Sequence, residues 1–109
     1  MKVIESKIIE ALKSGKYYAY KKGYGVTGEI YHDMVVSGNA YLIGTCYAQL
    51  KGNTLKLGVY GGAWKSVTTK SRINAVADAF GVPRIYQENR KWTWGDGVKY
   101  DGIREFSVK

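Results

Sequence analysis

Threonines and cations occur together in one short segment, and this combination could bind an anion. Thr68 and Thr69 are followed by Lys70 and Arg72 at the start of a stretch with helical periodicity. Backbone N–H groups in the first turn of a helix lack intrahelical partners, so a phosphate there would meet both N–H donors and positive side chains. These four residues are our candidate anion-binding site. The alternative is structural, because the Thr69 hydroxyl is a natural N-cap and Thr68 can bond to the preceding turn.

Aromatic and basic residues interleave in two further segments. The first is KYYAYKKGY at residues 16–24, and the second is RKWTW at residues 90–94. Flat rings beside positive charges suit stacking on nucleobases and neutralisation of phosphates. Alternatively, the rings of each strand face the core while the lysines solvate the other face. Our candidate aromatic–basic patch consists of Lys21, Lys22, Trp64, Lys65, Arg90, Lys91, Trp92 and Trp94.

Residues that could support catalysis are few. Nucleophilic catalysis needs a base beside a serine, threonine or cysteine, but the chain has a single histidine, His32, and a single cysteine, Cys46. In a regular strand the side chains of His32 and Asp33 point to opposite faces, so neither orients the other. One histidine and one cysteine also exclude an ordinary zinc site. We therefore expect no enzyme activity, no metal and no cofactor.

The charge of the chain favours a negatively charged partner. Its 109 residues include 17 Lys+Arg and 9 Asp+Glu, a net charge of +8. Residues 11–28 hold four lysines and no acid, and residues 34–77 hold five basic residues and no acid. A protein of this sign is attracted to polyanions or to acidic proteins. The length of the chain predicts a single domain. No apolar run approaches the roughly 18 residues that span a bilayer, so we expect no membrane-spanning helix. The single cysteine is typical of a protein in a reducing compartment.

Two amphipathic helices must position the candidate residues. Over Val3–Ser14, isoleucines and a leucine recur at helical spacing, and Gly15 stands where a C-cap belongs. The polar side of this helix is expected to carry Glu5, Lys7, Glu10 and Lys13. The second helix begins with Thr69 as its N-cap, has an apolar stripe that includes Ile73, and ends at Gly81.

Short strands occupy the rest of the chain. We predict strands at residues 17–22, 29–36, 40–50, 54–60, 63–67, 84–87, 91–94 and 103–108, separated by turns rich in glycine and asparagine. The isoleucine stripe of a short helix needs a surface to pack on. The fold class is therefore α+β: a single domain with an antiparallel sheet of short strands, an N-terminal helix and a second helix at about 70–80.

The segment from Trp64 to Asn74, WKSVTTKSRIN, resembles the signature of a small, largely uncharacterised bacteriophage domain family. In that family a Tyr/Trp-x-Ser-x-Thr-Thr element enters a helix that bears an Arg or His and then an Asn. The resemblance covers residues 40–108, so residues 1–39 would form a helix-plus-hairpin extension to a phage-type core. It implies a phage or prophage origin and brings no established activity.

Two functions of different classes follow as hypotheses. The first is a non-enzymatic phage accessory protein that binds nucleic acid or a nucleotide, in host takeover or counter-defence. The second is an inhibitor that binds the acidic surface of a host protein. Both place the protein in the host cytoplasm and away from the membrane, and neither fixes the oligomeric state, for which a dimer through an open strand edge is one option. The third class is an enzyme, and for it the sequence offers no arrangement of catalytic residues.

Overall fold

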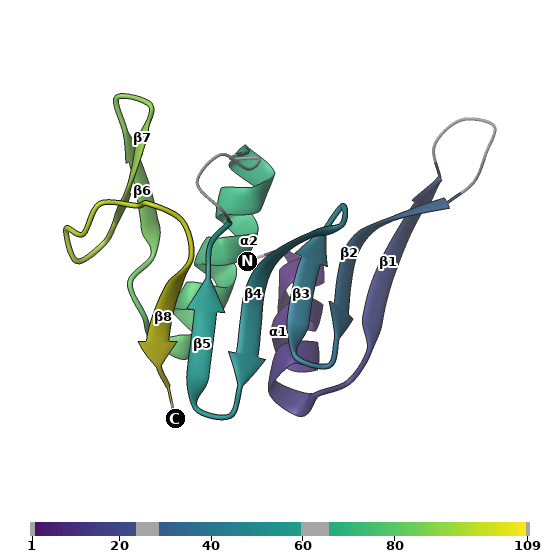
Figure 1. The fold of residues 1–109 in the computed structure, drawn as a ribbon. Coiled ribbons are helices and arrows are strands. Elements are labelled where there is room, and N and C mark those ends of the chain that lie inside the picture. The colour runs from purple at the N-terminus through teal and green to yellow at the C-terminus, as the bar shows by residue number, and fades with distance from the viewer. Residues whose placement is uncertain (1, 24–28, 60–65, 109) are drawn as a thin grey trace.

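The computed structural model describes residues 2–23, 29–59 and 66–108, and it consists of two layers. Helices α1 (Val3–Ser14) and α2 (Val67–Phe80) lie together against one face of a six-stranded antiparallel sheet (Figure 1). The sheet runs in the order β1-β2-β3-β4-β5-β8, with bounds Tyr18–Gly23, Glu29–Val36, Asn39–Leu42, Thr45–Lys51, Thr54–Leu57 and Arg104–Ser107. A separate antiparallel hairpin is formed by β6 (Ile85–Glu88) and β7 (Lys91–Trp94). The predicted α+β class is confirmed.

The core fills the space between the helices and the sheet. Each helix contributes its apolar stripe, and strands β2 to β5 contribute the side chains that face it. Fully buried members include Ile8, Leu12, Val35, Ala40, Leu55, Leu57, Ile73 and Val76. A helix as short as α1 is only marginally stable in isolation, so its stability comes from this packing. Neither described helix has the length and apolarity that crossing a membrane requires.

Two-residue turns join most neighbouring strands, and one of them was missed from sequence. The predicted strand 40–50 is two strands, because Ile43 and Gly44 form a tight turn between paired Leu42 and Thr45. Both turn residues have positive φ, 47° at Ile43 and 79° at Gly44. A β-branched residue in this left-handed region is unusual. The local pattern therefore favours one continuous strand, and the prediction was wrong here.

Helix α2 begins earlier than predicted, and its N-cap is Ser66 rather than Thr69. The Ser66 hydroxyl oxygen accepts a hydrogen bond from the Thr69 backbone N–H at 3.1 Å, as an N-cap side chain does. Val67, which closed the predicted strand at 63–67, is the first helical residue, while positions 63–65 lie outside the described residues. The predicted C-terminal ends of both helices are confirmed, because Gly15 and Gly81 are left-handed C-cap residues with φ of 72° and 68°.

Candidate functional site

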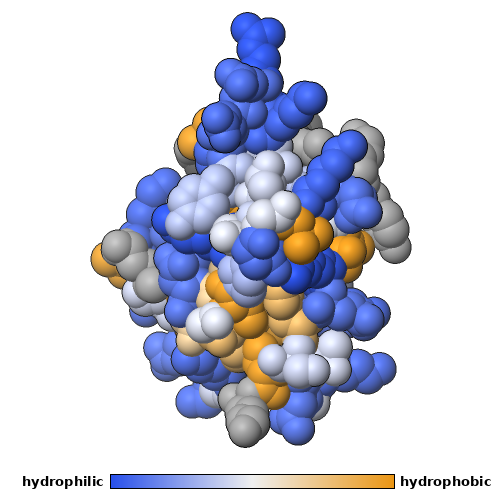
Figure 2. Space-filling view, turned by 90° about the vertical axis from the view of Figure 1, so that its left-hand side faces the viewer, coloured by the Kyte–Doolittle hydropathy of each residue, from blue (hydrophilic) through white to orange (hydrophobic). Residues whose placement is uncertain are grey.

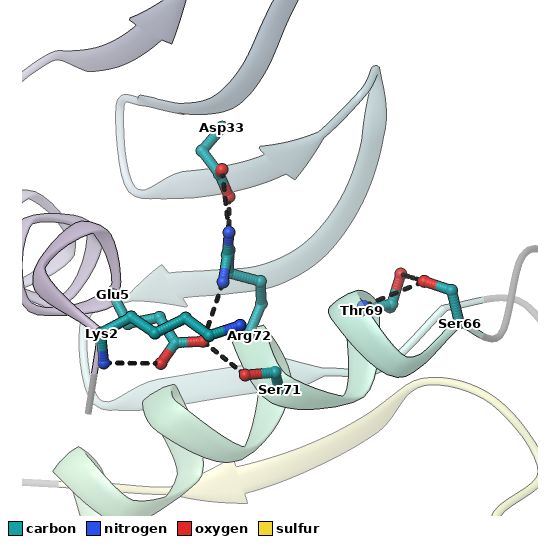
Figure 3. Close-up of polar contacts among 7 residues, drawn as sticks. All are labelled: Lys2, Glu5, Asp33, Ser66, Thr69, Ser71 and Arg72. Carbon is teal, nitrogen blue, oxygen red and sulfur yellow. Dashed lines mark hydrogen bonds and ion pairs between the residues drawn. The ribbon is translucent and has the colours of Figure 1, made fainter.

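Arg72, a predicted anion ligand, lies in a buried network of ion pairs. Its Nε donates to Asp33 Oδ1 at 2.7 Å, Nη2 donates to Asp33 Oδ2 at 3.3 Å, and Nη1 donates to Glu5 Oε2 at 2.9 Å (Figure 3). The side chains of Arg72, Glu5 and Asp33 are 9%, 5% and 1% exposed. The guanidinium is thus occupied by two carboxylates of its own chain. These internal partners argue against the predicted contact of Arg72 with an external phosphate.

Hydrogen bonds offset the desolvation of this network. Burial, the largest single influence, acts to raise the pKa of Glu5, but hydrogen bonds from the Ser71 hydroxyl, the Lys2 backbone N–H and Arg72 bring it below its ordinary value. Burial likewise acts to lower the pKa of Arg72, and its bonds to Asp33 and Glu5 raise it instead. Glu5 and Arg72 therefore stay charged near neutral pH, and the network of Glu5, Asp33 and Arg72 joins α1, β2 and α2.

The other predicted anion ligands do not assemble into a site. Thr69 is 5% exposed, and its hydroxyl is 3.0 Å from that of Ser66, so it belongs to the helix cap. Thr68 is exposed. Lys70 donates from Nζ to Gln87 Oε1 at 3.1 Å on the β6–β7 hairpin. The first turn of α2 therefore has the capping role that the sequence offered as the alternative to anion binding. Lys70 and Arg72 are bonded to Gln87 and to Asp33 and Glu5 within the chain.

Asn74, the last residue of the WKSVTTKSRIN segment, attaches the hairpin to α2. Its amide N–H donates to the Ile85 carbonyl at 2.9 Å, and its side-chain oxygen accepts from the Ile85 backbone N–H at 2.6 Å. Asn74 is 7% exposed, so this backbone-like pairing is shielded from water. Together with the Ser66 cap and the Arg72 network, it gives the segment a chiefly structural role.

The structure separates the predicted aromatic–basic patch. Trp92 and Trp94 are 7% and 1% exposed, and their rings pack on Tyr100 at centroid distances of 5.1 and 5.6 Å. They therefore have the core position that the sequence offered as the alternative to stacking on a ligand. Alternate residues of a strand that packs on the core must face inward, and these tryptophans do so. The exposed members are Lys21, Arg90 and Lys91, whereas the side chain of Lys22 and all of Trp64 and Lys65 lie outside the described residues.

A groove between α1 and β1 is the strongest candidate site. A cleft of about 520 Å³ is lined by Val3, Ile4, Lys7, Tyr18, Tyr20, His32, Asp33 and Arg72. A second hollow, of about 120 Å³, is its neighbour: it shares Lys7 and Tyr18 and is also lined by Glu10, Ala11, Ser14, Lys16 and Tyr17. We call these two neighbouring depressions together the α1–β1 groove. Concave sites with aromatic walls and a few polar groups are where proteins usually bind ligands.

His32 reaches the groove because β2 contains an irregularity. Tyr20 pairs with Asp33 and Lys21 pairs with Tyr31, which leaves His32 as an extra residue between two consecutive pairs. Such a bulge breaks the strict alternation of side chains, and both His32 and Asp33 line the groove. The expectation that they occupy opposite faces is therefore wrong. A bulge next to a candidate site is a common way to re-aim a side chain.

The groove presents three tyrosines and two lysines to solvent. Tyr17 is 64% exposed, Tyr20 is 45% exposed, and Tyr18 between them is half-buried. Lys7 projects from α1, and Lys16 lies just before β1. Among the described residues of the lining, Glu10 is the one acid outside an ion pair, because Asp33 is held by Arg72. The electrostatic character of the described lining is therefore weakly positive.

Sequence reasoning noticed the 16–24 segment but did not choose its groove residues. A usable signal was present, because Tyr18 and Tyr20 are two positions apart and so share one face of a strand. A second signal indicates the buried ion-pair network: Glu5 precedes Ile8, Ile9 and Leu12 at i+3, i+4 and i+7. Glu5 therefore lies on the apolar stripe of α1, and the expectation that it lies on the polar side is wrong. An acid at such a position indicates a buried partner.

Comparison with known families now identifies the group to which the chain belongs. Residues 1–107 match the model of the family described as Kyanoviridae Gp96 protein. The matched range includes residues 1–39, so it contains both walls of the groove together with α2 and the hairpin. No curated protein and no solved structure gave a match. The family supports the bacteriophage origin that the resemblance implied: this chain belongs to the Kyanoviridae Gp96 protein family.

Proposed function

We propose that the protein binds single-stranded nucleic acid in the α1–β1 groove. One observation carries the proposal: three closely spaced aromatic residues, Tyr17, Tyr18 and Tyr20, line a groove that also holds Lys7 and Lys16. Unstacked bases bind aromatic faces, while lysines along the groove neutralise the backbone. This recognition requires no sequence preference, because every base has a π face.

The exposure of the rings supports this use. A tyrosine that served only the fold would be expected to bury most of its ring, as Tyr47 and Tyr100 do at 1% and 5% exposure. Tyr20 remains accessible at the cleft of about 520 Å³, which is large enough for a base, and Tyr17 remains accessible at the neighbouring hollow. The rigid floor formed by Arg72 and Asp33 holds β2 and α2 in place, so the groove needs little reorganisation on binding.

A groove of this kind suits a non-enzymatic accessory protein. Stacking and charge neutralisation require no reacting side chain, so the role that we propose is binding without catalysis. The phage family supports a bacteriophage origin. The role that we propose is in host takeover or counter-defence, in which the protein covers nucleic acid or retains a nucleotide. The acidic surface of a host protein is the competing partner, and it becomes an outcome of the test below.

The test is fluorescence anisotropy with a labelled single-stranded 12-mer, in DNA and RNA form, at about 50 and 200 mM salt. Tyr20→Ala removes one stacking ring and should weaken binding about 5- to 150-fold, because stacking contributes about 1–3 kcal/mol per base. Lys7→Gln should reduce the slope of log Kobs against log salt by about 0.7, the value for one single-strand phosphate contact.

Two exposed residues outside the groove provide matched controls. Tyr86→Ala removes a ring that is 56% exposed on β6, and Lys51→Gln removes an exposed lysine at the β4–β5 turn. Both should bind the single strand like the parent protein. Equal losses in Tyr20→Ala and Tyr86→Ala would contradict the proposal. Absence of binding at 50 mM salt would also reject it and would favour an acidic host protein, to be sought by pull-down from host lysate.

A further inference from the structure

The β6–β7 hairpin is a second exposed basic feature, on the other side of the molecule. It is not part of the six-stranded sheet and projects beyond it near β8, whereas the groove lies at the β1 edge (Figure 1). In Figure 2 its hydrophilic tip forms the highest point of the molecule. Residues 86–91 are all exposed. The hairpin and the α1–β1 groove therefore do not overlap and can bind independently.

The projecting hairpin is held firmly at its base. Asn74 pairs with both backbone groups of Ile85, and the Gly95 N–H donates to the Arg84 carbonyl at 2.7 Å. The Trp94 ring is buried against Phe106, at a centroid distance of 5.5 Å. These contacts fix the direction of the hairpin, so its tip is preorganised for a partner.

The turn at the tip carries an arginine where the fold favours glycine. Glu88 pairs with Lys91, and the two residues between them, Asn89 and Arg90, have φ of 50° and 66°. Two-residue hairpin turns with positive φ at both positions strongly prefer Asn-Gly. Three other two-residue turns that the structure describes each contain a glycine, Gly38, Gly44 or Gly52. A strained residue at an exposed tip points to function rather than to stability.

The side chains at the tip are available to a polyanion. Arg90 and Lys91 are exposed, and within the described part of the chain neither takes part in an ion pair. Glu88 is the one acid of the two strands and faces the same side as Lys91. Lys70, bonded to Gln87, and Lys99, which pairs with Thr93, add a cation beside each strand.

The dimensions of the hairpin match a duplex groove. The two paired backbones lie about 4.8 Å apart, so the ribbon is narrower than a groove about 12 Å wide, and four residues in each strand, at about 3.3 Å per residue, give a length of about 13 Å, which exceeds the depth of that groove. The major groove of B-form DNA is about 12 Å wide and 8.5 Å deep, and it admits a two-stranded ribbon. We propose that the β6–β7 hairpin inserts its tip into the major groove of double-stranded DNA, with Arg90 and Lys91 at the base edges and phosphates, and Lys70 and Lys99 beside the backbone.

The test uses the full chain and a labelled 20-base-pair DNA duplex, again between about 50 and 200 mM salt. The double variant Arg90→Gly/Lys91→Gln should weaken duplex binding at least about fivefold and reduce the salt slope by about 0.9 for each phosphate that the variant no longer neutralises. Arg90→Gly relieves the strained turn, so weaker binding by this variant cannot come from unfolding. Thermal melting of each variant verifies that point.

The outcomes separate this proposal from the proposed function of the groove. The hairpin variant should bind the single-stranded 12-mer like the parent, and the Lys51→Gln control should bind the duplex like the parent. Unchanged duplex affinity and slope in the hairpin variant would overturn the inference, as would absence of duplex binding at 50 mM salt. If Tyr20→Ala weakens duplex binding and the hairpin variant does not, the duplex occupies the groove and the hairpin proposal fails while the groove proposal stands.

Discussion

Replacement of Arg72 by methionine tests whether the buried network stabilises the fold. Arg72→Met keeps most of the side-chain length but removes the three hydrogen bonds, at 2.7, 2.9 and 3.3 Å, to Asp33 and Glu5. Both carboxylates would remain buried, at 1% and 5% exposure, without their common partner. Removal of one partner from a buried ion pair destabilises a protein by about 3–5 kcal/mol.

That destabilisation is large compared with the total stability. A domain of this size unfolds with a free energy of about 5–15 kcal/mol, and its unfolding entropy lowers the melting temperature by roughly 4 °C per kcal/mol. We therefore expect Arg72→Met to melt roughly 12–20 °C below the parent at pH 7. Exposed Lys91 provides the matched control, because Lys91→Met should change the unfolding free energy by less than about 0.5 kcal/mol.

The pH dependence of the unfolding free energy provides a second test of the role of Arg72. The pKa of Glu5 is below its ordinary value in the folded protein, so its contribution to stability is present above the unfolded pKa and is lost as pH falls through the folded one. Arg72→Met removes part of what depresses this pKa, and burial then favours the protonated acid. The deficit of the variant should therefore shrink between pH 7 and about pH 4.

Urea unfolding followed by circular dichroism, at several pH values, measures both effects. The triple variant Arg72→Met/Glu5→Gln/Asp33→Asn tests the explanation further, because it removes the unpaired charges and should recover part of the stability. A deficit under about 1 kcal/mol at pH 7, or one that does not change with pH, would refute the reasoning.

Two other substitutions probe the backbone that positions the hairpins. Asn74→Ala leaves the buried N–H and carbonyl of Ile85 without their partner, so the unfolding free energy should fall by about 2–4 kcal/mol with an unchanged denaturant m-value; a decrease below about 0.5 kcal/mol would show that water replaces the amide. Ile43→Asn places a residue that tolerates positive φ at the β3–β4 turn, where Ile43 has φ of 47° and is 39% exposed. The melting temperature of Ile43→Asn should be roughly 4 °C above that of the parent, for a gain of about 1 kcal/mol in unfolding free energy. A melting temperature below that of the parent would show that the turn is not strained.

The sequence determines the regular elements well because their signals are local. Strands β2 and β7 have the predicted bounds, and both helices end at the predicted glycines, since periodicity and left-handed caps involve neighbours in the chain. The turn at Ile43 was missed for the same reason. Its neighbours are apolar on both sides, so nothing nearby marks a break in the strand.

The candidate site depends on contacts that no local pattern contains. Arg72 looked like a surface cation beside Lys70, but its partners lie 39 and 67 positions away, so the sequence could not show that it was occupied. The alternation of Trp92 and Trp94 showed that they share a face, and only the packing on Tyr100 showed which face is buried. His32 entered the groove through a bulge, which depends on the pairing register of two strands.

The position of α2 in the chain has a consequence for how the protein is made. One of the two helices that cover the sheet begins at Val67, and it carries Arg72, the cation that pairs with Glu5 and Asp33. A ribosome therefore releases α1 and several strands before the segment that completes their core exists. Such non-local contacts slow folding and leave apolar surface exposed meanwhile. The nascent chain must remain incompletely folded until α2 emerges, and the same late event closes the core and forms the floor of the groove.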